Sequence, residues 1–223
     1  MNDVIAVLWR ERASAILRTD DQRRAASAMD AAVRGGFRVV EFTLTIPGAL
    51  ELIAEFARRP GVLVGAGTVL TTAQASASLA AGARFIVSPV VDDDVIAAAR
   101  EGGAVAMPGA HTPTEMLRAH RAGAELIKLF PAPAGGPTYV RSVLAPLPFL
   151  RIVPTNGVAV DNAAAYLEAG CFAVGMVASV FDAGDLAAGR FERVEERARE
   201  IRGAVQRVAR PESPPAVPDP SRG

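Results

Sequence analysis

The chain has 223 residues, half of them hydrophobic, which is enough for one large α/β domain or two small ones. Its 24 basic residues balance 24 acidic ones, so no net charge draws it toward nucleic acid or an anionic membrane. A single cysteine, Cys171, cannot form an internal disulfide, and with only two histidines, His111 and His120, it does not complete a zinc site. Because there is neither an apolar run of roughly 20 residues nor a signal-peptide core, we expect a cytoplasmic protein without nucleic-acid or membrane partners.

Short apolar segments alternate with amphipathic ones along the chain. Eight apolar segments have the composition of buried strands: residues 14–18, 38–44, 63–69, 85–90, 104–109, 126–131, 151–157 and 171–176. Helical periodicity marks residues 20–34, 47–58, 71–81, 92–101, 112–122 and 161–169 between them. Residues 3–12 are predicted to form a short helix before the first strand, and residues 185–210 a long charged helix after the last one.

Capping residues and glycines delimit these helices. Several helices open with a residue that caps well, namely Asp20, Thr71, Asp92, Thr112 and Asp161. A glycine suited to the left-handed position follows five of them: Gly36, Gly82, Gly103, Gly123 and Gly170. Eight repeated strand–helix units predict a parallel (β/α)₈ TIM barrel over residues 1–210, with a doubly wound open sheet as the alternative. Residues 211–223, five of which are proline, are predicted to be a disordered tail.

Strand side chains alternate in direction, so each strand has one set facing the barrel interior and one facing the helices. In the second strand, Val39, Glu41 and Thr43 share the face opposite to Val40 and Phe42. The same reasoning groups Lys128 with Leu126 and Phe130, Ile16 with Arg18, Ala66 with Thr68, and Val153 with Thr155. We therefore expect a carboxylate, an amine, a guanidinium and two hydroxyls to converge inside one barrel.

Lys128 carries the sharpest signal, because it is the only lysine in a chain with 23 arginines and lies within an apolar strand. Burying an ammonium is costly, and burial favours the neutral amine, which can attack a carbonyl and form a Schiff base. Arginine cannot replace lysine in that reaction. The alternative is a structural ion pair with Glu41, which arginine would satisfy equally well. In the catalytic interpretation Glu41 is the general acid and base.

Glycine-rich strand ends offer backbone N–H groups to an oxyanion or a phosphate. They are residues 65–68, residues 155–157 and Gly175, and the loops after strands seven and eight are the usual phosphate site of such barrels. Turns alone also account for many glycines. His111 is predicted to lie in a loop, His120 on a helix surface and Cys171 in a buried strand, all without a catalytic role.

Six segments in order resemble the 2-keto-3-deoxy-6-phosphogluconate (KDPG)/4-hydroxy-2-oxoglutarate aldolase family. They are residues 40–44, 64–69, 87–89, 107–109, 127–131 and 154–158, and Gly-Ala-Gly-Thr-Val followed by Lys-Leu-Phe-Pro is the most specific combination. The resemblance spans residues 14–208. It implies a class I aldolase on a (β/α)₈ barrel, typically a homotrimer, that needs neither a metal nor another cofactor. Such an enzyme cleaves a 2-keto-3-deoxy-6-phospho sugar acid into pyruvate and glyceraldehyde 3-phosphate.

The resemblance also implies roles for individual residues. Lys128 corresponds to the Schiff-base lysine and Glu41 to the general acid/base. The resemblance further implies that Thr68 and Thr155 contact the pyruvyl part and that Pro89 and Phe130 are pocket walls. Asn156, Gly157 and Gly175 are candidate binding residues through the backbone N–H groups of the strand ends.

Four positions depart from the family pattern. Thr45 stands where many phosphogluconate-type members have an arginine for the substrate carboxylate, and Arg18 resembles a substrate-binding arginine of the phosphogalactonate-type members. Residues 135–139 are also closer to that branch. Asn156 replaces a glycine, and Val177-Ala178 replaces a Gly-Ser pair, so a valine would crowd a phosphate. The resemblance therefore leaves 4-hydroxy-2-oxoglutarate and unphosphorylated 2-keto-3-deoxy acids open as substrates.

Two other classes of function were compared with an aldolase. A phosphosugar isomerase or synthase barrel would require a second carboxylate or a histidine in the interior, and the pattern places none there. A non-catalytic phosphosugar-binding or assembly protein on the same scaffold would form no covalent adduct with pyruvate.

Overall fold

The computed structural model describes residues 3–209, 213 and 215. Most of the tail predicted for residues 211–223 lies outside the described residues. None of the helices in the described part is long and apolar enough to cross a membrane.

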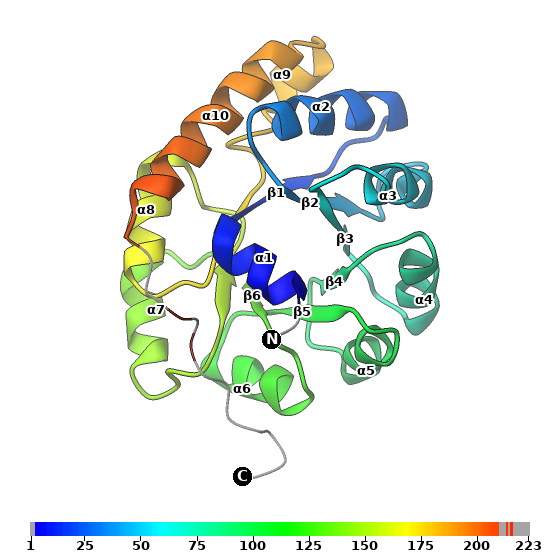
Figure 1. Ribbon diagram of the computed structural model, residues 1–223. Coiled ribbons are helices and arrows are strands. Elements are labelled where there is room, and N and C mark those ends of the chain that lie inside the picture. The colour runs from blue at the N-terminus through cyan, green and yellow to red at the C-terminus, as the bar shows by residue number, and fades with distance from the viewer. Residues whose placement is uncertain (1–2, 210–212, 214, 216–223) are drawn as a thin grey trace.

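Eight parallel strands form the predicted TIM barrel (Figure 1). The strands are β1 (Ala13–Leu17), β2 (Val39–Thr43), β3 (Leu63–Gly67), β4 (Phe85–Ser88), β5 (Val105–Ala110), β6 (Ile127–Leu129), β7 (Ile152–Pro154) and β8 (Val174–Met176). They are paired in the order β7-β6-β5-β4-β3-β2-β1-β8. A parallel bridge between Thr155 and Gly175 joins the two outer strands. The ring of strands is therefore closed, as a (β/α)₈ fold requires.

Between residues 3 and 209, ten helices accompany these strands. They are α1 (Asp3–Glu11), α2 (Gln22–Arg34), α3 (Ala49–Ala57), α4 (Thr72–Ala80), α5 (Asp93–Glu101), α6 (Pro113–Arg121), α7 (Gly136–Leu144), α8 (Val160–Glu168), α9 (Ala183–Ala187) and α10 (Phe191–Arg207). The side chains of Thr71, Asp92 and Thr112 cap their helices as predicted. The five predicted glycines all have positive φ.

Three predicted helix boundaries are wrong. Asp21, not Asp20, caps α2 by accepting a hydrogen bond from the Arg24 amide. Helix α8 begins one residue before Asp161, and the Asn162 side chain accepts from the Ala159 amide in place of an N-cap side chain. The long last helix is interrupted between α9 and α10, where Gly189 has a φ of 66°.

The ion pairs of Asp185 account for that interruption. This buried carboxylate accepts from Arg190 Nε and Arg197 Nη1, each at 2.6 Å, and so ties α9 to the start and the second turn of α10. A continuous helix would place these three side chains differently, because residues five and twelve positions apart do not share one face.

Helix α1 covers the centre of the ring in Figure 1. Its buried residues Val4, Ile5 and Leu8 belong to a cluster that fills the interior of the barrel. Trp9 continues this contact, with its ring centroid 5.0 Å from that of Phe172. The interior is therefore packed at this end, and open space for a ligand lies at the other end.

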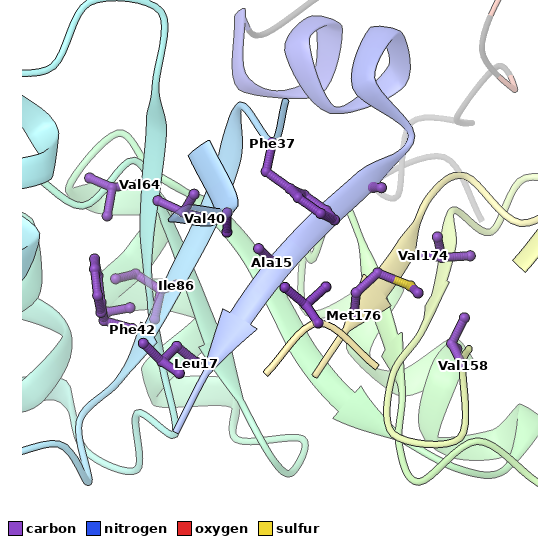
Figure 2. Close-up of a cluster of buried hydrophobic side chains, with 14 of the residues drawn as sticks. Ala15, Leu17, Phe37, Val40, Phe42, Val64, Ile86, Val158, Val174 and Met176 are labelled. Atoms are coloured by element: carbon purple, nitrogen blue, oxygen red, sulfur yellow. The ribbon is translucent and has the colours of Figure 1, made fainter. Parts of the chain in front are cut away.

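A second and larger apolar cluster lies between the strands and the surrounding helices (Figure 2). It contains Leu17, Phe42 and Met176 from the outward faces of three strands, together with Phe37 from the turn before β2. Residues that alternate with these along the same strands face the interior, so the two clusters divide each strand as the period of two predicts.

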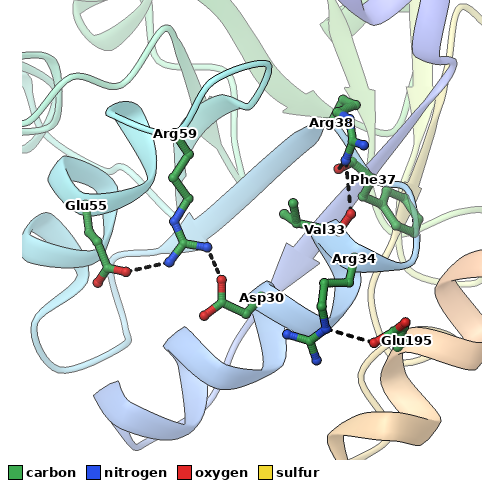
Figure 3. A network of polar contacts seen from close by, with 8 residues as sticks. All are labelled: Asp30, Val33, Arg34, Phe37, Arg38, Glu55, Arg59 and Glu195. Atoms are coloured by element: carbon green, nitrogen blue, oxygen red, sulfur yellow. Dashed lines mark hydrogen bonds and ion pairs between the residues drawn. The ribbon is translucent and has the colours of Figure 1, made fainter.

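Arginine ion pairs join the outer helices to one another (Figure 3). Arg59 follows α3 and pairs with Asp30 of α2, and also with Glu55 at 2.5 Å. Arg34 at the end of α2 donates to Glu195 of α10 at 2.8 Å. These contacts fix α2 between its neighbours but lie away from the barrel mouth.

Candidate active site

Lys128 lies in the middle of β6, a strand of three residues whose other two side chains face outward into the helix cluster. Its side chain is 7% exposed, and Nζ lies 4.9 Å from the centroid of the Phe130 ring. Among the described residues, Lys128 takes part in no ion pair. The amine therefore points into the barrel with an aromatic face beside it, as the alternation predicts.

A cavity of about 160 Å³ opens above Lys128 at the carboxyl ends of the strands. Its lining comes from β1, β2, β6 and the loops after β7 and β8: Ile16, Arg18, Thr43, Lys128, Phe130, Thr155, Asn156 and Val177. This end of a TIM barrel is where reactive groups are usually found, because every strand delivers one side chain to the same mouth.

Glu41 lies on β2, two residues before the lining residue Thr43 and on the same inward face of the strand. Strands β2 and β6 are four positions apart around the ring, so Glu41 and Lys128 face each other across the interior. Glu41 is fully buried, and neither carboxyl oxygen has a hydrogen-bond partner among the described residues. Burial raises the pKa of Glu41, while the charges of Lys128 and Arg18 oppose that rise. An unpaired buried carboxyl facing an amine is an arrangement typical of functional sites.

Arg18 brings a guanidinium to the same mouth. It follows β1, and its Nη2 donates a hydrogen bond to Thr68 Oγ1 at 3.3 Å. Thr68 reaches this position because its φ of 60° turns the chain at the end of β3. The structure thus brings the two residues together, with most of the Arg18 donor groups left for a ligand.

The predicted grouping of Ala66 with Thr68 on the interior face is wrong. Ala66 packs in the outer cluster, and the inward positions of β3 are Leu63, Gly65 and Gly67. Strict alternation fails at Thr68 because the strand ends at Gly67 and the left-handed backbone reverses the direction of the next side chain.

Thr155 and Asn156 contribute polar groups from the end of β7. The Thr155 hydroxyl is buried and has no partner among the described residues. Asn156 has a φ of 62°, which asparagine tolerates. The Ala132 amide donates to the carbonyls of Thr155 and Asn156 at 3.1 and 3.0 Å. These hydrogen bonds join the segment after Phe130 to the end of β7.

Four predicted binding residues do not line the cavity, and Thr68, which contacts Arg18 instead, is one of them. Gly175 lies beneath Thr155, where an added Cβ would be 2.5 Å from Oγ1, so its visible role is to leave room for that side chain. Gly157 follows Asn156 with a φ of 109° and shapes the loop. Pro89 lies against Gly109, whose missing side chain makes space for the Pro89 carbonyl.

Three lining residues were not predicted as binding residues: Ile16, Thr43 and Val177. Thr43 Oγ1 lies 3.2 Å from the Leu17 carbonyl and 2.9 Å from Thr45 Oγ1. Alternation already placed Ile16 and Thr43 inside the barrel, and Val177 follows Gly175 by two positions. The alternation of side chains could therefore have identified these residues as facing the interior, but it does not show which interior residues bind a ligand.

The histidines and the cysteine lie outside the cavity. His111 is in a loop as predicted, where Nδ1 lies 3.0 Å from the Pro131 carbonyl and the Tyr139 hydroxyl donates to the His111 carbonyl. His120 is buried against Phe149, with ring centroids 4.8 Å apart, so its prediction as a surface residue is wrong. Cys171 is buried just before β8, and burial raises the pKa of its thiol. The part of the chain that the structure describes holds no cluster of three residues suited to a metal ion.

Comparison with known proteins gives consistent results. Residues 4–197 match the family model described as KDPG and KHG aldolase. The chain is 39% identical over 173 residues to a probable 2-dehydro-3-deoxy-6-phosphogalactonate aldolase of Rhizobium meliloti, an alignment that covers 76% of this chain and 82% of the relative.

Solved structures agree. A structure described as native KDPGal superposes with a TM-score of 0.81 at 32% identity, covering 88% of this chain and 95% of that one. The KDPG aldolase of Legionella pneumophila, solved with pyruvate captured at low pH as a covalent carbinolamine intermediate, gives 0.79 at 25% identity over 88% of this chain and 97% of that one.

Proposed function

Because the chain belongs to the KDPG and KHG aldolase family, whose members are carbon–carbon lyases, we propose that it cleaves a 2-keto-3-deoxy sugar acid through a Schiff base on Lys128. The products are pyruvate and an aldehyde. The observation that supports this most directly is the placement of Lys128 in a cavity with Arg18 and Thr155, opposite the unpaired carboxyl of Glu41.

The proposed reaction begins with attack of the neutral Lys128 amine on the C2 carbonyl carbon. The carbinolamine loses water to give an iminium ion. A proton then leaves the C4 hydroxyl, the C3–C4 bond breaks, and its electron pair forms an enamine as the aldehyde departs. Protonation at C3 and addition of water return pyruvate and the free amine. No external oxidant, reductant or cofactor enters this balance.

Glu41 is the proposed carrier of these protons. It has no competing hydrogen bond among the described residues, and burial raises its pKa, so its proton affinity is closer to that of the groups it must serve. Its place across the interior from Lys128 allows it to act on a substrate held between them.

Arg18 is the proposed partner of the substrate carboxylate. Lys128 is consumed in the covalent bond, which leaves Arg18 as the cation among the residues that line the cavity. A guanidinium binds a carboxylate through two parallel hydrogen bonds. Thr68 orients Arg18, Thr155 offers a hydroxyl to the pyruvyl part, and Phe130 forms an apolar wall.

Two classes of substrate fit the proposal, and they differ in whether the end of the substrate far from the keto acid carries a phosphate. Relatives named for 6-phospho sugar acids favour a phosphorylated substrate that yields glyceraldehyde 3-phosphate. One observation favours 4-hydroxy-2-oxoglutarate or an unphosphorylated 2-keto-3-deoxy acid instead. Val177 lines the cavity beside Asn156, where an apolar side chain occupies space that a phosphate would take.

Assembly and cellular location complete the proposal. Resemblance to the family favours a homotrimer, and the balanced charge with a single cysteine favours the cytoplasm. Leu70 and Val90 are about half exposed on the loops after β3 and β4 and are candidates for subunit contacts.

Pyruvate release tests this function. The protein is incubated with 2-keto-3-deoxygluconate, its 6-phosphate, their galactonate epimers and 4-hydroxy-2-oxoglutarate, and pyruvate is measured in each. We expect one of these acids to be cleaved by the wild type and none by the Lys128→Arg variant. Cleavage by Lys128→Arg would refute the Schiff-base mechanism, and a wild type that cleaves none would favour a non-catalytic protein.

A further inference from the structure

Two glycines lie on the inward face of β3, and their backbone conformation does not require glycine. Gly65 and Gly67 are strand residues without positive φ, in contrast to ten other glycines of the described residues, which lie in loops and at helix ends with positive φ. A side chain would be compatible with the backbone at both positions. What each glycine provides is therefore space, and the groups that use the space differ.

At Gly67 the space is occupied by the carboxyl of Glu41, the proposed general acid/base. An added Cβ would overlap Oε1 of Glu41 and would lie 2.8 Å from Cδ and 3.1 Å from Cγ of the same side chain. Glu41 pairs in register with Gly65, and Gly67 lies two residues further along β3 toward the barrel mouth. The Glu41 side chain therefore reaches toward the mouth, and its carboxyl contacts the backbone of β3 at Gly67.

At Gly65 the space is occupied by a side chain of the apolar core, Phe85. An added Cβ would overlap three atoms of the Phe85 ring, which is buried in the interior cluster beneath the cavity. A ring packed on all sides cannot move without displacing its neighbours. A carboxyl at the end of a flexible side chain can rotate away, so the two positions respond to the same substitution in different ways.

We propose that Gly67 is a positioning residue for the reaction: its missing side chain leaves the slot that holds the Glu41 carboxyl opposite Lys128. This inference rests on the proposed function, because it assigns Glu41 its role in proton transfer. A methyl group at position 67 displaces the Glu41 carboxyl from this space, while the Lys128 amine, the Arg18 guanidinium and the fold keep their places.

The experiment measures exchange of the pyruvate methyl protons for deuterium, which requires the iminium and a group that removes a C3 proton, but no sugar. We expect Gly67→Ala to bind pyruvate and, after prolonged incubation, to form the borohydride-trapped adduct on Lys128, because the amine itself is unchanged. Its exchange rate at saturating pyruvate should fall about 10-fold or more, within the roughly 10²-fold that a general acid/base contributes. Its pH–rate profile should shift because the carboxyl has a new environment.

A double variant shows whether the effect passes through Glu41. Glu41→Gln alone should slow exchange, and adding Gly67→Ala should then change the rate by less than about 2-fold, because residues that act as one unit are not additive. Gly65→Ala is the matched control. It should lower the melting temperature, and any effect on exchange should be the same factor with and without Glu41→Gln.

Stability supplies a second test that does not depend on turnover. In a Glu41→Ala background the clashing carboxyl is absent, so adding Gly67→Ala should cost no melting temperature. A cost equal to that in the wild-type background would overturn the proposal.

Wild-type exchange and an unchanged pH profile in Gly67→Ala would also overturn the proposal, as would an equal fall in the Glu41→Gln background. The proposed function itself fails separately, if wild-type protein forms no pyruvate adduct on Lys128.

Discussion

Glu41 combines complete burial with a carboxyl that has no hydrogen-bond partner among the described residues. A carboxyl that is fully buried without a hydrogen bond among the described residues costs the fold about 1–3 kcal/mol, which the charges of Lys128 and Arg18 offset only in part, since the pKa of Glu41 is still raised. The cost is consistent with a group kept for chemistry.

The burial of Glu41 should make the free energy of unfolding depend on pH. Since burial raises the pKa of Glu41 above 4.5, the folded protein holds a proton that the unfolded chain releases, and stability falls as pH rises through this window. The Glu41→Gln variant lacks that loss. Its free energy of unfolding relative to wild type should therefore increase by up to about 1.4 kcal/mol per pH unit above pH 4.5, until the folded carboxyl ionises.

Urea unfolding across this pH range measures the difference. Thr43→Val, a change at a buried neighbour on the same strand that does not titrate, is the control and should differ from wild type by a constant amount. A constant difference for Glu41→Gln as well would show that the carboxyl ionises equally in both states.

Arg18 sets the affinity for the substrate carboxylate in this account. Arg18→Lys keeps the charge but loses the planar fork, so the KM for the cleaved acid should rise about tenfold, equivalent to about 1.4 kcal/mol. The melting temperature should change little, because within the part of the chain that the structure describes the guanidinium hydrogen-bonds only to the Thr68 hydroxyl. Steady-state kinetics, with Arg23→Lys at an exposed position as the control, measure it. An unchanged KM would assign the carboxylate to another group.

Residue identities in the cavity followed from the sequence wherever a strand was regular. Alternation placed Glu41, Lys128 and Thr155 inside because each lies in or directly after a β-strand. It failed for Ala66 because Thr68 lies beyond the strand end with a left-handed backbone. The space that Gly67 and Gly175 leave for neighbouring side chains could not be predicted, since it depends on which atoms meet across two strands.

At the scale of elements, helix α1 closes one end of the barrel through three buried side chains. Ile5→Ala should lower the free energy of unfolding by about 2–5 kcal/mol, because its packed surroundings cannot collapse onto the void. Arg10→Ala on the exposed side of the same helix should change it by less than about 0.5 kcal/mol. Denaturant unfolding of both variants checks this, and a cost below about 1 kcal/mol for Ile5→Ala would mean that α1 is only loosely seated.

The helices show which local signals are reliable. The caps at Thr71, Asp92 and Thr112 and the left-handed glycines were predicted because each depends on one residue and its immediate neighbours. The interruption between α9 and α10 was missed because periodicity continues through Gly189, whereas the ion pairs of Asp185 are made in the folded structure. Helix α7 was not predicted because Gly135, Gly136 and Pro137 obscure its start.

The eight-stranded barrel was predictable from the repeated strand–helix unit. Of residues 211–223 the structure describes 213 and 215, and the Pro215 carbonyl accepts a hydrogen bond of 3.1 Å from Arg151 Nη2. Truncation after Arg210 should therefore leave activity and melting temperature unchanged, since a single hydrogen bond of this kind contributes about 1 kcal/mol. Thermal unfolding and sedimentation of the truncated protein test this, and loss of an assembly on truncation would make these residues a contact segment.

The central claim is that Lys128 forms a Schiff base, and borohydride reduction in the presence of pyruvate tests it most directly. Mass spectrometry should show one reduced pyruvyl group per chain, and peptide mapping should locate it on Lys128, because the only other amine is the N-terminus. The Lys128→Arg variant keeps the charge and should fold without forming the adduct. An adduct that persists in Lys128→Arg, or its absence from the wild type, would contradict the account.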